Sequence, residues 1–164
     1  HAITLSQLVR LNTERCRRLN FFNELNFSTN RSFEVCDITK QVEGVVRESG
    51  VLEGTVSITS LHTTCAISVN ENEERLFEDI RNFFLTIASP EGSYKHNDLH
   101  LRINIPPDEP ENAHAHLIAM ILGNSETVPL HGGALVLGRY QSILFLEMDG
   151  PRERTCAVQV VGVS

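Results

Sequence analysis

Several features that would assign a class of protein at once are missing from this 164-residue sequence. The four cysteines include no C-x-x-C pair, and no apolar run approaches the ~20 residues that span a bilayer. Neither a phosphate-binding loop of the form G-x-x-x-x-G-K-[ST] nor an Asp-rich magnesium motif occurs. Internal repeats and low-complexity tracts are also absent. These absences argue against a membrane-spanning helix, a small disulfide-stapled scaffold and a P-loop enzyme.

Positive charge is scarce as well. The sequence has 14 Lys and Arg against 21 Asp and Glu, a formal net charge of -7. We therefore expect no general nucleic-acid partner and no polybasic contact with a membrane. Arg139, Arg152 and Arg154 lie close together near the C-terminus and could still form a local basic pocket. The apolar fraction of 41% and charged fraction of 21% are typical of a soluble globular protein, and the length fits a single domain over residues 1–164.

The cysteines are scattered along the chain. Their even number permits two disulfides, but a chain of this length can bury a core without them. We expect four free thiols and, because the N-terminal residues lack the apolar core of a signal peptide, a cytoplasmic location. The four residues are Cys16, Cys36, Cys65 and Cys156.

Apolar residues at helical spacing predict four helices. They cover residues 4–19, 37–50, 72–88 and 112–123. Asp37 is expected to cap the second helix, which Gly50 ends. In the third helix, the residues predicted to face the core are Leu76, Ile80, Phe83, Phe84 and Ile87.

Alternating apolar and polar residues predict the strands. Alternation around residues 25–27 and 33–35, on either side of Thr29-Asn30, predicts a hairpin. Residues 54–69 form two central strands or one long bent strand, and residues 89–111 form a long polar loop. Further strands are expected at residues 134–137, 142–148 and 155–163. Helices among antiparallel strands indicate an α+β fold, a compact sandwich of mainly antiparallel strands with helices packed on it.

Three of the seven histidines occupy positions that favour a site. His62 ends a predicted strand, His96 lies in the long loop, and His116 lies in the fourth helix. Three imidazoles around one centre with an open position would be the ligand set of a catalytic zinc ion. His114 is two residues from His116, so a helix would turn the two side chains to different faces. The alternative is that these are ordinary hydrogen-bonding histidines.

Other candidate residues have two interpretations each. Cys65 could be a nucleophile paired with His62, but its alternating strand favours a small core residue. Glu71 is either a carboxylate in the first turn of a helix or a general acid/base near the histidines. Arg152, in the sequence Asp149-Gly150-Pro151-Arg152, is either a turn residue or an anchor for a phosphate or carboxylate.

Taken together, these segments resemble the YjbQ family of uncharacterised proteins (UPF0047). The resemblance rests on an ordered set of short motifs between residues 33 and 162, which we take as the family core. The motifs are His62-Thr63-Thr64, Asn70-Glu71, Asp79, Tyr94-x-His96-Asn97, Asn112-x-x-Ala115-His116-Leu117, Gly138-x-x-Gln141 and Asp149-Gly150-Pro151-Arg152-x-Arg154. Residues 1–22, including the first predicted helix, look like an N-terminal extension.

The resemblance implies a homotrimer with a polar pocket near the subunit contacts. Exposed edges left by the apolar strands at residues 144–148 and 157–163 would be a second reason to assemble. Members of the family are commonly named secondary thiamine-phosphate synthases, which join a hydroxymethylpyrimidine diphosphate to a thiazole phosphate and release pyrophosphate. The residues carried over to the pocket are His62, His96, His116, Glu71, Thr63, Thr64, Asn97 and Arg152.

The leading expectation is therefore an enzyme that acts on a phosphorylated small molecule in a histidine-lined pocket. The alternatives are a metal-dependent hydrolase, with a divalent ion such as zinc on His62, His96 and His116 and Glu71 as base, and a non-enzymatic trimeric protein that binds a metal or metabolite. Arg139-Tyr140 stands where the family has Thr-Trp, so the substrate preference of relatives does not transfer directly.

Overall fold

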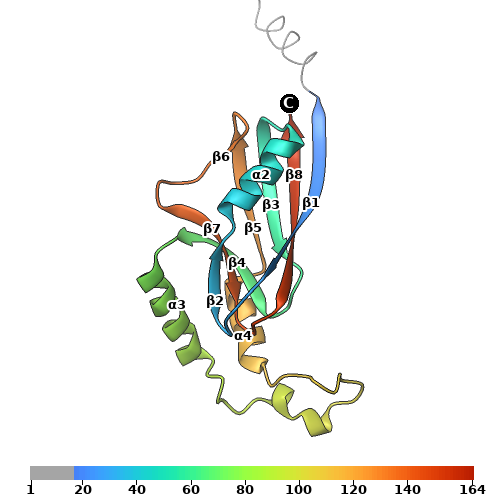
Figure 1. Ribbon diagram of the computed structural model, residues 1–164, viewed down its shortest axis with the longest axis vertical. Coiled ribbons are helices and arrows are strands. Elements are labelled where there is room, and N and C mark those ends of the chain that lie inside the picture. The colour runs from blue at the N-terminus through green and yellow to red at the C-terminus, as the bar shows by residue number, and fades with distance from the viewer. Residues whose placement is uncertain (1–16) are drawn as a thin grey trace, which may run out of the picture.

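The structure, a computed structural model, describes residues 17–164 and contains two antiparallel sheets (Figure 1). The larger sheet has the order β1 (Arg18–Ser28), β8 (Glu153–Val163), β3 (Glu53–Ser60), β5 (Ser125–His131) and β6 (Ala134–Leu135). The smaller sheet has the order β2 (Glu34–Asp37), β7 (Gln141–Glu147) and β4 (Cys65–Glu71). The predicted α+β class and antiparallel sandwich are confirmed.

The main core lies between the larger sheet on one side and the smaller sheet with α2 (Thr39–Ser49) on the other. Val56, Ile58 and Phe145 are fully buried there. Helix α2 contacts β1 and β8 and buries its valines against them. Gly50 ends it in the left-handed conformation (φ 68°), as predicted.

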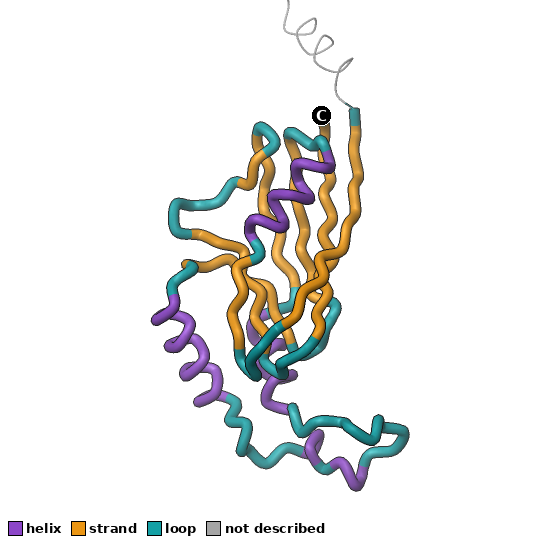
Figure 2. Tube along the Cα trace, viewed as in Figure 1, coloured by secondary structure: helices purple, strands orange, loops and turns teal. Residues whose placement is uncertain are grey.

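A second apolar cluster covers the other face of the smaller sheet. Ala66 of β4 and Leu144 of β7 pack there with Ile118 of α4 (Ala113–Leu122). Strand β7 is therefore buried on both faces, and this explains its unbroken apolar run. The remaining helix, α3 (Glu74–Ile87), and residues 89–111 extend away from the two sheets (Figure 2).

One prediction about local pairing is wrong. Strand β1 does not form a hairpin with β2: it pairs with β8 from Arg18 to Ser28, whereas β2 pairs with β7 in the other sheet. The turn after Ser28 carries the chain from one sheet to the other, which alternation alone does not reveal. The predicted first helix lies mostly in residues 1–16, outside the described part, and the chain is a strand from Arg18 onward.

The third predicted helix forms as α3, but its predicted core face is only partly right: Ile80 and Phe84 pack partly against the second apolar cluster. No residue of α3 is buried, and Phe83 and Ile87 are 61% and 52% exposed. The exposed edges predicted for β7 and β8 are also absent, since each of these strands lies between two other strands.

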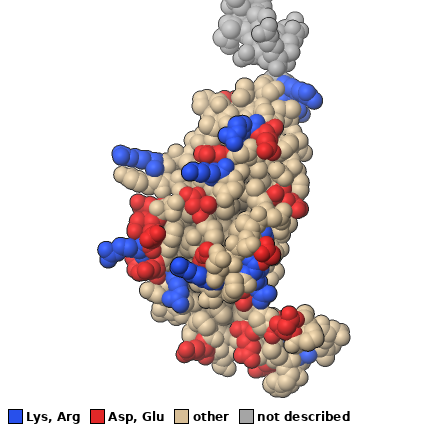
Figure 3. Space-filling view, in the orientation of Figure 1, with Lys and Arg blue, Asp and Glu red and all other residues tan. Residues whose placement is uncertain are grey.

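Among the described residues, no helix is long and apolar enough to cross a membrane. On the face seen in Figure 3, Lys and Arg are dispersed among Asp and Glu.

Candidate functional site

The candidate site lies where the connection between β3 and β4 meets α4. A cavity of about 740 Å³ opens between these two segments. The size is typical of a small-molecule site. Its lining includes two of the three predicted histidines, His62 and His116. The full set is Thr59, Ser60, Leu61, His62, Thr63, Cys65, His116, Ala119, Met120, Gly123 and Asn124.

His116 contacts a second imidazole. The ring centroids of His96 and His116 are 4.8 Å apart, and the rings meet edge to face at 73°. His96 comes from a short 3₁₀ turn (Lys95–Asn97) in the long loop, whereas His116 projects from α4. Burial, followed by the neighbouring His96, lowers the pKa of His116, so this imidazole is neutral at pH 7.

His62 is held by a backbone group of β8. Its Nε2 atom accepts a hydrogen bond of 2.9 Å from the N–H of Thr155. In a neutral imidazole the proton then lies on Nδ1, which makes His62 an N–H donor. Burial, and then the positive charge of Arg154, lower the pKa of His62, so the neutral form prevails at pH 7.

The three histidines therefore do not form one ligand set in this structure. Within residues 17–164 no group of three His, Cys, Asp or Glu side chains is spaced to hold a metal ion. His96 and His116 meet, and His116 and His62 share a cavity, but the lone pair of His62 Nε2 faces Thr155.

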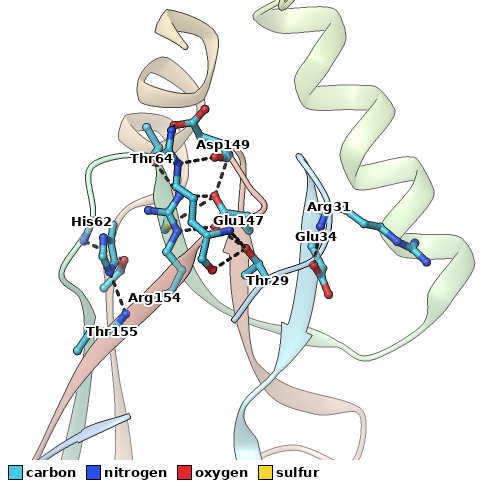
Figure 4. Close-up of polar contacts among 12 residues, drawn as sticks. Thr29, Arg31, Glu34, His62, Thr64, Glu147, Asp149, Arg154 and Thr155 are labelled. Atoms are coloured by element: carbon cyan, nitrogen blue, oxygen red, sulfur yellow. Dashed lines mark hydrogen bonds and ion pairs between the residues drawn. The ribbon is translucent and has the colours of Figure 1, made fainter. Parts of the chain in front are cut away.

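A buried ion pair stabilises the structure beneath the cavity (Figure 4). Arg154 of β8 donates from Nε and Nη2 to Glu147 of β7 at 2.5 and 2.6 Å, and the two residues are 5% and 0% exposed. Glu147 also accepts a bond from Thr29 Oγ1 at 3.0 Å, and Arg154 donates to Thr64 Oγ1 at 3.2 Å. The pair thus joins both sheets to the segment that carries His62. No role was predicted for Glu147 from the sequence, although a carboxylate at the end of an apolar strand can indicate a buried polar contact.

Cys65 belongs to the same network as a core residue. It is fully buried, and its thiol lies 3.7 Å from Glu147 Oε1. Burial and the nearby carboxylate raise the pKa of the thiol far above its ordinary value. The core interpretation is thereby supported over the nucleophile.

Arg152 is occupied by its own turn. Its Nε and Nη2 atoms donate to the backbone oxygen and to Oδ2 of Asp149 at 2.8 and 3.0 Å. The same Oδ2 accepts a bond of 2.8 Å from Nδ2 of Asn112, which precedes α4. Asp149 therefore fastens the turn to the start of α4, whereas Arg152 bonds within the turn itself, and the Arg152 side chain remains 42% exposed.

Asn97 fixes the long loop to α4. Its Oδ1 atom accepts a bond of 3.1 Å from the N–H of Ala113, the first residue of the helix. Three side-chain atoms in the described chain are buried without a hydrogen-bond partner, and all three lie in this loop and helix terminus. They are His96 Nε2, Asn112 Oδ1 and His114 Nδ1. Such groups are rare in native proteins, and their concentration here points to a ligand or ordered water.

Glu71 is not part of the site. It ends β4, six residues beyond Cys65, which is roughly 20 Å along an extended strand. The predicted place of Glu71 in the first turn of the helix is wrong, because α3 begins at Glu74 and the residue that caps it is Glu73, whose carboxylate accepts the N–H bonds of Arg75 and Leu76 at 2.9 and 2.8 Å. The acidic run between Glu71 and Glu74 made the capping residue ambiguous in the sequence.

Comparison with known proteins agrees with the fold. The model of the family described as UPF0047 protein YjbQ-like matches residues 23–163. The chain belongs to the YjbQ family. A UPF0047 protein of Methanothermobacter thermautotrophicus is 41% identical over 142 residues, which cover 87% of this chain and 92% of the relative. One from Archaeoglobus fulgidus is also 41% identical, over 84% of this chain and 99% of the relative.

Solved structures show the same fold. A YbjQ-like protein of unknown function from Sulfolobus solfataricus superposes with a TM-score of 0.80 at 41% identity, covering 89% of this chain and 99% of that one. A hypothetical protein from Aeropyrum pernix gives a TM-score of 0.78 at 40% identity, covering 86% and 98%. The family match begins at residue 23, whereas β1 already begins at Arg18.

Proposed function

We propose that this chain is an enzyme that acts on a phosphorylated small molecule in the cavity between the β3–β4 connection and α4. One observation carries the proposal: two neutral imidazoles, those of His62 and His116, line the same cavity. His62 offers an N–H at Nδ1, because its Nε2 is occupied by Thr155. His116 is a neutral imidazole backed by His96, and it can accept or relay a proton.

The surroundings suit an anionic group. Thr63 lines the cavity and Thr64 lies directly below it, next to the guanidinium of Arg154. The guanidinium of Arg154 lies close to His62 and gives a locally positive potential. Its ion pair with Glu147 leaves the site without added net charge. A phosphate would therefore be bound mainly through N–H and O–H donors. This differs from the expected anchor, Arg152, which is held by Asp149.

The reaction that the family resemblance supports is transfer of the thiamine-phosphate synthase type. The bond from the pyrimidine methylene carbon to the diphosphate oxygen breaks, and a bond from that carbon to the thiazole nitrogen forms. Negative charge develops on the departing diphosphate. Donors aimed at that charge, with His62 Nδ1–H first among them, would stabilise the transition state.

A metal-dependent hydrolase is the second candidate, and the unpartnered Nε2 of His96 favours it. His96 and His116 have the donor type and proximity to hold a divalent ion such as zinc. A bound ion would supply a Lewis acid at the edge of the cavity. His62 does not fit as the third ligand in the arrangement observed, and neither does Glu71 as base. A non-enzymatic metal- or metabolite-binding protein would use the same two imidazoles.

One experiment separates these candidates. Protein purified without nickel affinity is assayed for bound metal, and then for thiamine phosphate formation and phosphate-ester hydrolysis with and without a chelator. The transferase predicts product that is lost in His116→Ala but kept in His131→Ala, an exposed control paired with Glu53. Chelator-sensitive hydrolysis would support the hydrolase instead. Stoichiometric metal without either activity would support the binding protein.

The resemblance implies a homotrimer, and the cysteines and the N-terminal residues predict a cytoplasmic location; we carry both statements as part of the proposal. The support for assembly comes from exposed apolar side chains and not from the strand edges that the sequence predicted. Large apolar side chains are exposed on α3 and at the cavity mouth, including Phe83, Leu61 and Met120, which are 61%, 53% and 82% exposed. Such surfaces commonly mark contacts between proteins.

A further inference from the structure

One arginine of the long loop is turned inward, although both of its neighbours in the chain are apolar. In the sequence Leu101-Arg102-Ile103, Leu101 and Ile103 are 71% and 85% exposed, whereas the Arg102 side chain is 27% exposed. This arrangement reverses the usual one, in which the charged residue faces water and the apolar residues are covered. The orientation of Arg102 is therefore set by the groups that its guanidinium contacts.

The guanidinium of Arg102 joins two distant parts of the loop. Its Nη1 atom donates to the backbone oxygen of His96 at 3.3 Å, and its Nη2 atom donates to Oε1 of Glu109 at 2.7 Å. The Glu109 side chain is also mostly covered, at 21% exposed. Solvent and salt screen a partly buried ion pair less than a surface pair, so this contact can hold the loop in one conformation.

The backbone of the loop folds back so that Glu109 meets Arg102. Asn104 adopts the left-handed conformation (φ 60°), which Asn tolerates better than most residues. Further along, the N–H of Glu109 donates to the backbone oxygen of Pro106 at 3.2 Å. Arg102 itself follows the 3₁₀ turn Leu99–Leu101, and its N–H donates to the backbone oxygen of Leu99 at 3.1 Å. The ion pair therefore joins the two ends of a folded segment.

The bond to His96 connects this folded segment to the candidate site. The His96 imidazole lies edge to face against His116, with the ring centroids 4.8 Å apart, and His116 lines the cavity. The next residue, Asn97, is bonded through its side chain to the N–H of Ala113 at 3.1 Å. The main chain that carries the His96 ring is thus held by α4 on one side and by Arg102 on the other.

We propose that Arg102 is a positioning residue of the candidate site, which keeps the imidazole of His96 packed edge to face on His116. Arg102 acts through the backbone of His96 and through Glu109, and it needs no contact of its own with a substrate. The part of His116 in the reaction rests on the proposed function, but the contact between the two rings exists without it and is measured separately.

Nuclear Overhauser effects between the ring protons of His96 and His116 test the positioning. The native protein should show them, because the ring centroids are 4.8 Å apart. Arg102→Gln should lose them, since the shorter, uncharged side chain cannot hold both partners. Arg102→Lys can still pair with Glu109 and should retain part of the intensity, and Glu109→Ala should weaken it by freeing the other end of the guanidinium. Lys95→Gln is the matched control: it removes the same charge from the exposed residue next to His96 and should keep the native intensity.

Steady-state kinetics provide a readout that a purely structural role would not move. If the native protein forms thiamine phosphate, Arg102→Gln should lower kcat about tenfold or more by misplacing the two imidazoles, with a smaller change in KM. Native ring contact in Arg102→Gln overturns the proposal. So does an equal loss of contact in Lys95→Gln, or a native kcat in Arg102→Gln despite lost contact.

The two measurements also separate this inference from the proposed reaction. Native protein that forms no thiamine phosphate contradicts the reaction alone, because the ring contact is still measured. In that case, loss of the contact in Arg102→Gln, with native contact in Lys95→Gln, supports the positioning role by itself. Circular dichroism of each variant confirms that the sheets and helices are intact.

Discussion

The Nε2 atom of His62 accepts a hydrogen bond of 2.9 Å from the backbone N–H of Thr155. This bond joins the β3–β4 connection to the strand that carries Arg154, and it fixes which ring nitrogen of His62 holds the proton. Replacement by Ala leaves the Thr155 N–H without its partner. His62→Ala should lower the free energy of unfolding by about 1 kcal/mol in urea denaturation. His62→Gln, whose Oε1 can accept in its place, should recover part of the loss, and equal losses in the two variants would contradict this role.

The buried pair of Glu147 and Arg154 should respond differently to single and double replacement. Arg154→Met leaves the Glu147 carboxylate buried and unpaired, and should destabilise the fold by about 3–5 kcal/mol. Removing both charges with Glu147→Leu and Arg154→Met leaves no buried charge, and should recover about half of that loss or more. Urea denaturation of the two single variants and the double variant measures the coupling. Additive losses would show that the pair does not interact as described.

Because of the same ion pair, we expect the stability of the fold to decrease at acid pH. Burial raises the pKa of Glu147, but the hydrogen bonds and charge of Arg154, together with bonds from the Asp149 N–H and Thr29, lower it more, so the net shift is downward. A carboxylate with a lowered pKa adds stability above its unfolded pKa of about 4.3, and this stability is lost as the pH falls through the folded value. The unfolding free energy should therefore fall below about pH 4.3 in the native protein, and fall less steeply in the double variant. Parallel pH profiles would contradict the assignment.

The site histidines affect the stability of the fold in a higher pH range. Burial is the first cause that lowers the pKa values of His62, His114 and His116. In the unfolded chain a histidine titrates near pH 6.5, so around that pH the unfolded state binds more protons than the folded state. Stability should therefore rise with pH through this window and decline as the pH falls below about 6.5. His116→Gln should flatten the slope between pH 5.5 and 7, whereas the exposed-site variant His131→Gln should not.

The thiols provide a test that does not depend on the site. Cys36, Cys65 and Cys156 are free, and burial raises the pKa of Cys36 to about 11 and that of Cys156 to about 12. These three should resist alkylation at pH 8 in the folded protein, because little thiolate is present. After unfolding without reductant, all four cysteines of the chain should react. Two or fewer reactive thiols would contradict the predicted absence of structural disulfides and the proposed cytoplasmic location.

The sequence was sufficient to predict the elements with clear periodicity. Helix α2 with its Gly50 stop, α3, α4 and the apolar strand β7 all follow from residue spacing. Pairing was not predictable, because the alternating pattern of β1 fits any antiparallel neighbour and its partner β8 is more than a hundred residues away. The outward face of α3 was missed because a helix with two apolar stripes has the same local pattern whether the second stripe is covered or open.

The sequence indicated which residues meet in the candidate site more than it indicated their contacts. The His62, His96 and His116 motifs led to the region of the cavity, but neither the hydrogen bond to Thr155 nor the ion pair of Glu147 and Arg154 is predictable from spacing. Both are contacts between strands that are distant in the chain. Arg152 and Asn97 were assigned to ligand binding, whereas in the structure Arg152 bonds to Asp149 within its own turn and Asn97 fixes the long loop to α4.

The central claim is that the cavity of His62 and His116 binds a phosphorylated small molecule. The most direct measurement is ¹H–¹⁵N NMR of the histidine side chains during titration with hydroxymethylpyrimidine diphosphate, thiazole phosphate and pyrophosphate. We predict saturable shifts of the His62 and His116 resonances with at least one of these compounds, while exposed His131 stays unchanged. If none of the three compounds moves His62 or His116, or if all histidines shift alike, the cavity is not the site proposed here.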